Sequence, residues 1–542
     1  MEQGNKNGKL AGLILAIVAI VVIVALFGSL CTCFCTVGAC FKPDGCANDL
    51  LPDIDEPVVF DTPAATPTEA PVTPEPTEPS GAVSPLDWDG QQSAEVVNPA
   101  AWVREKKVQL KNDGTDTVTV LVLMNGSDLE SEYQEATEDL REMVRAEKSD
   151  RVNILVETVG TRKWDPYFGI SSRRAERYRV TNKGLTLVDD SLGQLDTTDP
   201  STLSDFIRWG EQNFPADRYI LLLWDHGGGP VYGFGYDEFQ PYTAALTIDE
   251  MQLALRDGGV YFDLIGMDCC LMSSLEVCCA LYDYCDYTLL SEDFEPSCGW
   301  SHSEWLTALA KDPAIPTQAL AKTAIDASVK AAERNSRIDG GLTLALIDEA
   351  YVALLYPAWA EFAYENEATL LAANYSQLRQ STGRAHPRAV GAWTNGNDTT
   401  LDDYCITDIL SLAENIPSGA SDALRAALNQ AIAYFGATKD ETTLSGLSVT
   451  LPYGDAELYS ELRRVFLNAG IDADYVAWLR KFVSVETETG FFDFGGWSGW
   501  GDYSGDYDWG DWFDLFGGSD EWDDWTAGGF TLEDIFGRLL GE

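Results

Sequence analysis

Short, continuous runs of apolar residues alternate with amphipathic stretches through the first half of the chain. The runs lie at residues 118–124, 152–157, 219–224, 262–267 and 287–291. Runs of this length without polar alternation predict strands that are buried on both faces. The amphipathic stretches predict helices at residues 128–147, 203–209, 246–255 and 271–281. Because strands and helices alternate, we expect a mostly parallel sheet with helices on both faces.

The pattern changes after residue 305. From there to about residue 483 the spacing of apolar residues is mainly helical, with long amphipathic stretches at 319–334 and 422–435. A strand is predicted at residues 444–451, where the sequence reads LSGLSVTL. The chain is therefore predicted to be an α/β protein with a helical C-terminal elaboration.

An uncharged apolar segment near the start of the chain predicts a membrane anchor. Residues 10–30 carry no charge over 21 positions, which is enough for a helix to cross the ~30 Å hydrocarbon core of a bilayer. Lys6 and Lys9 precede the segment, so residues 1–9 are predicted to be a cytoplasmic leader and the bulk of the chain to lie outside the cell membrane. The alternative is a lipoprotein anchored at Cys40, because residues 37–40 resemble a lipoprotein processing site.

The composition of two further segments predicts that they do not pack into a core. Residues 31–92 hold five cysteines beside the anchor, for which metal binding, disulfides and a role as small hydrophobes all stay open, followed by a stalk rich in Pro, Thr and Glu. Residues 491–542 form an acidic tail rich in Gly, Asp and Trp. The folded domain is therefore expected at residues 93–490.

The net charge and the small number of histidines exclude several classes of function. The formal net charge is −51, which argues against nucleic acid as a partner and favours basic substrates. The chain has only three histidines, so a multi-histidine metal centre is not expected. Any chemistry that depends on an imidazole must use His226, His302 or His386.

Two predicted strands end in residues that can perform covalent catalysis. The first leads into His226 and a glycine turn, and the second leads into Cys270. The carboxyl ends of parallel strands meet at one edge of a sheet, so the imidazole and the thiol are predicted to lie together. With Cys270 at the start of the helix predicted at 271–281, the helix and the imidazole are both expected to lower the thiol pKa. Backbone N–H groups of Gly227 and Gly228 are candidates for binding the oxyanion of an acyl intermediate.

These segments resemble the clostripain-like cysteine peptidases of the caspase, legumain and gingipain group. The likeness rests on YILLLWDHGGG and LIGMDCCLMSSLEV, and extends to VLVLMNGSDLES, ILVETVG, SEDFEPSCGW, LSVTLPYG and YVAWLRKF. It implies a caspase-like α/β/α sandwich and peptide hydrolysis by a Cys-His dyad, His226 and Cys270. It also implies that Asp268 binds the Arg or Lys before the cleaved bond, whereas capping of the following helix is the structural alternative for this residue.

The chain departs from the family pattern in two places. Cys269 stands where a small residue such as Ala is usual, and the resemblance favours Cys270 over Cys269 as the nucleophile. Relatives often mature by cutting themselves after a basic residue between the catalytic His and Cys. Arg256 is the only base in that interval here, and it lies in a predicted helix.

The sequence therefore predicts a membrane-tethered, extracellular cysteine endopeptidase that cleaves peptides and proteins after Arg or Lys. Its chemistry needs no cofactor, and calcium enters only as an optional ligand implied by some relatives. Two alternatives stay open: an inactive peptidase fold that serves as a surface interaction protein, and an active peptidase with a preference for Asn or Asp.

Overall fold

A computed structural model describes residues 103–240, 245–334, 341–372, 406–439 and 444–484. All of these residues belong to one compact unit. The predicted anchor, stalk and acidic tail lie outside the described residues, and the domain boundaries stay predictions. None of the helices within the described part is long and apolar enough to cross a membrane.

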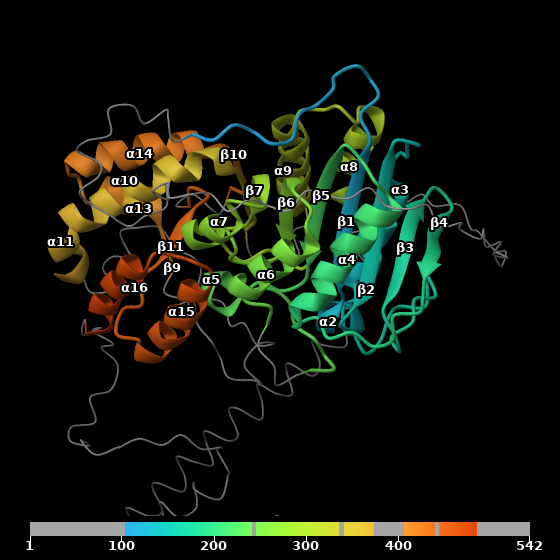
Figure 1. Ribbon diagram of the computed structural model, residues 1–542, viewed down its shortest axis with the longest axis horizontal. Helices are drawn as coiled ribbons and strands as arrows, with labels where there is room; N and C mark the ends of the chain where they lie inside the picture. Colours follow the sequence, from blue (N-terminus) through green and yellow to red (C-terminus); the bar gives the residue numbers. More distant parts are fainter. Residues whose placement is uncertain (1–102, 241–244, 335–340, 373–405, 440–443, 485–542) are drawn as a thin grey trace, which may run out of the picture. The chain divides into compact units, whose positions relative to one another are not determined.

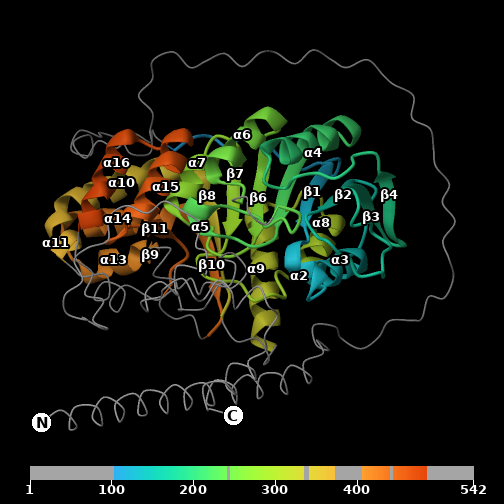
Figure 2. The ribbon, with the colours of Figure 1, turned by 90° about the horizontal axis from the view of Figure 1, so that it is seen from below.

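A nine-stranded sheet forms the centre of the described unit (Figures 1 and 2). Its strands are β1 (Val118–Asn125), β2 (Val152–Val159), β3 (Glu176–Thr181), β4 (Gly184–Asp189), β5 (Arg218–Trp224), β6 (Phe262–Asp268), β7 (Cys285–Leu290), β8 (Thr343–Asp348) and β10 (Ile432–Ala437). They are ordered β10-β8-β7-β6-β5-β1-β2-β3-β4. The five neighbours from β7 to β2 run parallel, and both edges of the sheet are antiparallel.

Helices cover both faces of the sheet because successive side chains of its buried strands point to opposite sides. On β1, Leu121 and Leu123 join one hydrophobic cluster, whereas Val120 and Val122 join another. The first cluster includes residues of α4 (Pro200–Asn213), α6 (Ile248–Gly258) and α7 (Leu275–Leu281). The second includes residues of α3 (Glu135–Arg145), α8 (His302–Lys311) and α9 (Thr317–Arg334). The predicted three-layer, caspase-like α/β/α architecture is confirmed.

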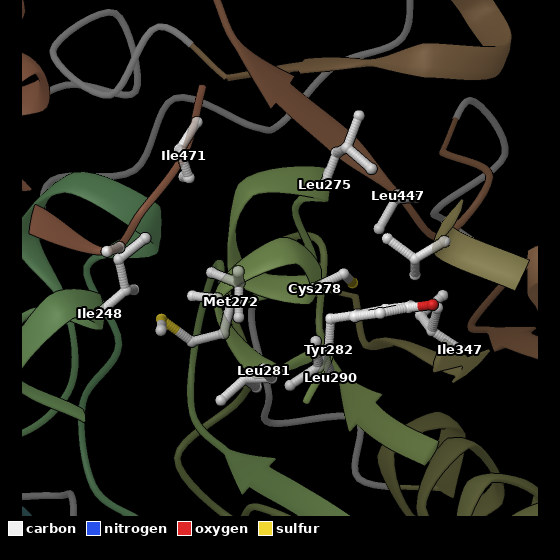
Figure 3. Close-up of a cluster of buried hydrophobic side chains, with 14 of the residues drawn as sticks. Ile248, Met272, Leu275, Cys278, Leu281, Tyr282, Leu290, Ile347, Leu447 and Ile471 are labelled. Carbon is white, nitrogen blue, oxygen red and sulfur yellow. The ribbon is translucent and has the colours of Figure 1, made fainter. Parts of the chain in front are cut away.

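The helical C-terminal elaboration extends the first cluster beyond the sheet. Its elements are α10 (Val352–Glu365), α11 (Glu367–Ala372), α13 (Ile409–Asn415), α14 (Gly419–Ala431), α15 (Ala456–Asn468) and α16 (Ala473–Leu479). In Figure 1 these helices gather beyond the β10 edge of the sheet, away from β3 and β4. Figure 3 shows the junction, where Met272, Leu275 and Cys278 around α7 lie among Ile347 of β8 and Leu447.

Three expectations about these elements are wrong. The stretch predicted as one helix at 128–147 is two helices, α2 (Ser127–Ser131) and α3, because Gln134 between them has a left-handed φ of 67°. The helix predicted at 422–435 ends at Ala431, and its last residues form β10. The strand predicted at 444–451 is only β11 (Ser448–Thr450), which pairs with β9 (Ile406–Asp408) outside the main sheet.

The buried ion pair at the start of β5 provides a stability test. Arg218 is 1% exposed, and its Nε donates to Asp263 at 2.6 Å while its guanidinium also caps carbonyls of Pro313 and Ile315. Arg218→Met leaves Asp263 with only the Thr317 hydroxyl, so we expect the free energy of unfolding to fall by about 3–5 kcal/mol. Urea unfolding followed by circular dichroism measures this change.

A matched variant separates the buried pair from charge loss in general. Arg208 forms an exposed pair with Asp205 on α4. Arg208→Met is expected to change the free energy of unfolding by less than about 1 kcal/mol. Equal effects of the two variants would contradict the structural importance assigned to Arg218.

Candidate active site

The predicted catalytic residues lie at the same level on neighbouring strands. β5 and β6 are parallel, and Trp224 is paired with Asp268. His226 and Cys270 each follow two residues later, beyond the carboxyl ends of these strands. The two segments pack closely, since a Cβ on Gly227 would lie 1.9 Å from the carbonyl oxygen of Cys270. Only glycine therefore fits at residue 227, and the chain directly after His226 packs against the backbone of Cys270.

His226 has a carboxylate partner that the sequence did not single out. Its Nε2 lies 2.8 Å from Oδ1 of Asp128, which belongs to the short helix α2 that follows β1. Burial lowers the pKa of His226, but the hydrogen bond to Asp128 and the charges of Asp225 and Asp128 outweigh it, so the pKa is raised. The pKa of Asp128 is lowered, because pairing with His226 outweighs its own burial. The two shifts agree with an ion pair of imidazolium and carboxylate.

Asp225 holds the loop that carries Asp128. It is 3% exposed, and its carboxylate accepts hydrogen bonds from Asn125 Nδ2 and Ser127 Oγ, both at 2.6 Å. Burial raises the pKa of Asp225 to about 7, against the opposing charge of His226. Because Ser127 begins α2 and directly precedes Asp128, this network fixes the position of the imidazole's partner.

Cys270 lies on a tight turn between β6 and α7, not at the start of a helix. α7 begins at Leu275, with Ser274 as its N-cap, so the predicted helix at 271–281 starts four residues too early. Leu271 has a φ of 67°, a left-handed conformation that is unfavourable for a residue with a side chain. The turn is held by the segment after β7, since Leu271 N–H donates to the Asp293 carbonyl and Ser273 N–H to the Ser291 carbonyl.

The pKa of the Cys270 thiol is raised, whereas the sequence predicted that it would be lowered. Burial is the main cause that raises its pKa to about 12; the carboxylates of Glu295 and Asp293 contribute to the rise, and the Glu295 N–H, which donates to Sγ at 3.2 Å, opposes it. The helix dipole expected to lower the pKa is absent at this residue, because α7 starts later. Cys270 must therefore lose its proton to a base during the reaction.

The other candidate residues have distinct environments. Cys269 is 3% exposed and packs in the first hydrophobic cluster, while the half-buried Cys270 lies beside Phe294 and Ile406. Gly228 N–H donates to the Gly233 carbonyl at 2.8 Å within its own turn. That bond occupies the Gly228 donor, so Gly227 is the better candidate of the two for binding an oxyanion.

Asp268 lies in a buried polar cluster rather than on an open surface. It is 4% exposed, its Oδ2 accepts a hydrogen bond from Trp300 N–H at 3.2 Å, and the same oxygen lies 3.0 Å from His302 Nε2. Asp139 lies 3.6 Å from that nitrogen. Since α7 is capped by Ser274, Asp268 does not cap the helix, and that structural alternative is wrong.

Among the described residues, Asp139, Asp268 and His302 are also spaced like metal ligands. One ligand atom of Asp139, Asp268 and His302 lies within 4.8 Å of each of the others. Calcium prefers six to eight oxygen ligands, which a buried set containing an imidazole does not match. Trp305 Nε1 lies 3.3 Å from His302 Nδ1, and an indole N–H can only donate. A neutral histidine that binds a metal through Nε2 needs its own proton on Nδ1, so this arrangement does not fit a metal site.

Comparison with known proteins identifies the class of protein that this fold and site define. The model of the clostripain family matches residues 122–486, so the chain belongs to the clostripain family and is a cysteine peptidase. The Cys-His chemistry of this family requires no cofactor. No curated protein matches the chain.

Several solved structures resemble the chain at low identity. A secreted C11 cysteine protease from Bacteroides thetaiotaomicron, in complex with an irreversible peptide inhibitor, is 17% identical, with a TM-score of 0.48 over 68% of this chain and 99% of that one. An inactive zymogen of a C11 protease from Parabacteroides distasonis is 16% identical, with a TM-score of 0.48 and the same two coverages.

Proposed function

We propose that the protein is a membrane-tethered, extracellular endopeptidase that cleaves after Arg or Lys, with Cys270 as nucleophile and His226 as general acid and base. The observation that carries this proposal is the register of β5 and β6, which brings His226 and Cys270 to one level with Gly227 against the Cys270 backbone. The family match independently supports the reaction class.

The chemistry follows from the protonated thiol. Neutral His226 takes the proton of Cys270 as the sulfur attacks the carbonyl carbon of the substrate, and the Gly227 N–H is the candidate donor to the resulting oxyanion. The imidazolium then protonates the leaving amine, and the C–N bond breaks to leave a thioester on Cys270. Water attacks this thioester with His226 as base, which releases the acid product and restores the thiol.

Substrate preference is assigned to Asp268. Three carboxylates, from Asp139, Asp268 and Glu295, interact with one another near the nucleophile, and their mutual repulsion raises the pKa values of Asp139 and Glu295 in addition to the dominant effect of burial. Because a raised pKa makes Asp139 and Glu295 easier to protonate, Asp268 is the carboxylate of the three that is assigned to a cationic side chain. The preference for a basic residue follows from this charge and from the resemblance at Asp268.

Cell-surface placement rests on the sequence. Residues 10–30 form the uncharged segment and the lysines precede it, while the lipoprotein alternative at Cys40 also places the domain outside. Proteinase K added to intact cells is expected to remove the catalytic domain but to spare a tag on residues 1–9. Protection of the catalytic domain until the cells are lysed would contradict this placement.

Reporter peptides that differ only in the residue before the cleaved bond test the preference. We expect the chain to hydrolyse Arg and Lys reporters, and to hydrolyse a citrulline reporter, which has the shape of Arg without its charge, far more slowly. Asp268→Asn is expected to lower kcat/KM for Arg by about 10- to 100-fold through loss of a charge-assisted contact, with little effect on citrulline. Faster hydrolysis after Asn or Asp would favour the alternative specificity.

A further inference from the structure

The buried cluster behind Asp268 contains a histidine that catalysis does not use. His302, at the first turn of α8, is fully buried, and its Nε2 lies 3.0 Å from Asp268 Oδ2 and 3.6 Å from Asp139. Trp305 and Trp300 pack around its ring. A buried imidazole beside two carboxylates has to be accounted for, because polar groups removed from water destabilise a protein unless they are paired.

We propose that His302 is the positioning residue of the pocket for basic side chains, where its Nε2–H holds Asp268 as an anion oriented toward the substrate. This inference rests on the proposed function, in which Asp268 receives the Arg or Lys. It concerns a residue whose effect on the substrate is transmitted through Asp268.

The tautomer of His302 follows from its neighbours. Trp305 Nε1–H is only a donor, so at 3.3 Å it requires Nδ1 of His302 to accept. The proton of the neutral ring then lies on Nε2, which faces the Asp268 carboxylate. Against the opposing effect of its burial, Asp139 and Asp268 raise the pKa of His302 to about 10, but the second proton would have to sit on Nδ1, opposite the Trp305 donor. The Trp305 contact therefore favours a neutral imidazole whose protonated Nε2 lies 3.0 Å from Asp268 Oδ2 and does not cancel the carboxylate charge.

The two oxygens of Asp268 have different surroundings. Oδ2 faces His302 Nε2 and the Trp300 N–H. Gly299 borders both oxygens, since a Cβ added there would lie 2.9 Å from Oδ1 and 3.2 Å from Oδ2. Gly299 is only partly buried and has a φ of 55°, so the lack of a side chain keeps the approach to Oδ1 free of one. His302 and Trp300 thus contact Oδ2, and Oδ1 is the atom assigned to the substrate's cation, with the Glu295 carboxyl as a further neighbour of Asp268.

Removing the donor should neutralise the pocket. A buried carboxylate without donors takes up a proton, because burial disfavours its charged form. A protonated Asp268 attracts an Arg side chain much less, whereas its effect on a neutral residue of the same shape is small. The ratio of kcat/KM for Arg over citrulline reporters therefore reports on His302 separately from the bond-breaking chemistry.

Two polar substitutions differ in which ring nitrogen they mimic. The amide nitrogen of His302→Gln can reach the position of Nε2, whereas that of His302→Asn is restricted to the position of Nδ1. We expect His302→Gln to retain most of the Arg-over-citrulline ratio, and His302→Asn to lower it by about tenfold or more, mainly through KM. Equal ratios in both variants and the wild type would overturn the role of His302. If the wild type hydrolyses neither Arg nor Lys reporters, the proposed function fails instead.

If the His302 variants do not fold, a measurement on the wild-type full chain still tests the proposal. The chain has only three histidines, so ¹⁵N-histidine labelling gives few imidazole signals in long-range ¹H–¹⁵N spectra. We expect one buried ring as the Nε2–H tautomer, unchanged by EDTA or Zn²⁺. If no buried ring has that tautomer, the proposal is wrong. If EDTA or Zn²⁺ shifts the signals of the buried ring and also changes Arg hydrolysis, the cluster is a metal site and the proposal is likewise wrong.

Discussion

Replacing Cys270 with alanine is expected to abolish peptide hydrolysis, with a loss of at least about 10⁴-fold in kcat. Cys270 is the half-buried thiol on the turn after β6, next to the glycine segment that follows His226. Cys270 forms the thioester in the proposed mechanism, so reporter cleavage by Cys270→Ala should fall to the level of the buffer. The substitution removes one sulfur from a partly exposed position, and the fold should survive it.

The adjacent cysteine provides the matched control. Cys269 carries the same thiol and directly precedes Cys270 in the chain. Its side chain, however, is buried in the first hydrophobic cluster and is only 3% exposed. Cys269→Ala is expected to retain hydrolysis within about tenfold, with a small loss of stability from the smaller side chain. An irreversible thiol-reactive peptide should label the wild type and Cys269→Ala but not Cys270→Ala. The reverse pattern would make Cys269 the nucleophile.

The parallel strands could be predicted from sequence because they are buried on both faces. Their apolar runs have no polar interruption, and β1, β5 and β6 lie close to the predicted bounds. Their order then placed His226 and Cys270 at one edge of the sheet. This part of the site depends on local patterns and on one general rule about parallel sheets.

The antiparallel edge strands were missed for a physical reason. β8 reads TLALID and β10 reads IAYFGA, and short apolar runs beside helices cannot be told from helix segments by periodicity alone. The glycines before β8 and within β10 were a usable signal, since glycine interrupts helices. The neighbouring helices determined the spacing of apolar residues in this part of the chain, so the two strands were interpreted as helical.

The supporting residues of the site depend on contacts that no local pattern contains. Asp128 and His226 are 98 positions apart, and Asp268 and His302 are separated in sequence by α7 and β7. Asp128 did carry one signal, as an acid just after a strand that ends at the same edge as β5. The expected low pKa of the thiol was wrong because it depended on where α7 begins, and helix boundaries are the least predictable feature of a helix.

Replacing Asp128 with asparagine is expected to lower kcat by about 10²- to 10³-fold. The Asp128 carboxylate accepts from His226 Nε2 at 2.8 Å and stabilises the imidazolium that forms when Cys270 loses its proton. Asparagine retains the size of the side chain but has no charge, so the imidazolium becomes less stable and the ring less well oriented. Because Asp128 is 21% exposed, water partly replaces the carboxylate, and the loss should stay below that of Cys270→Ala.

The pH dependence gives a second signature of the same contact. His226 must be neutral to accept the thiol proton, so activity rises as pH passes its pKa, which Asp128 and Asp225 hold above the ordinary value of about 6.5. Removing the Asp128 charge lowers that pKa, and the acidic limb of kcat/KM should therefore move to lower pH while the plateau falls. Glu132→Gln removes an exposed charge from the same segment and should leave both limb and plateau nearly unchanged. An acidic limb that stays in place in Asp128→Asn would show that Asp128 does not set the protonation of His226.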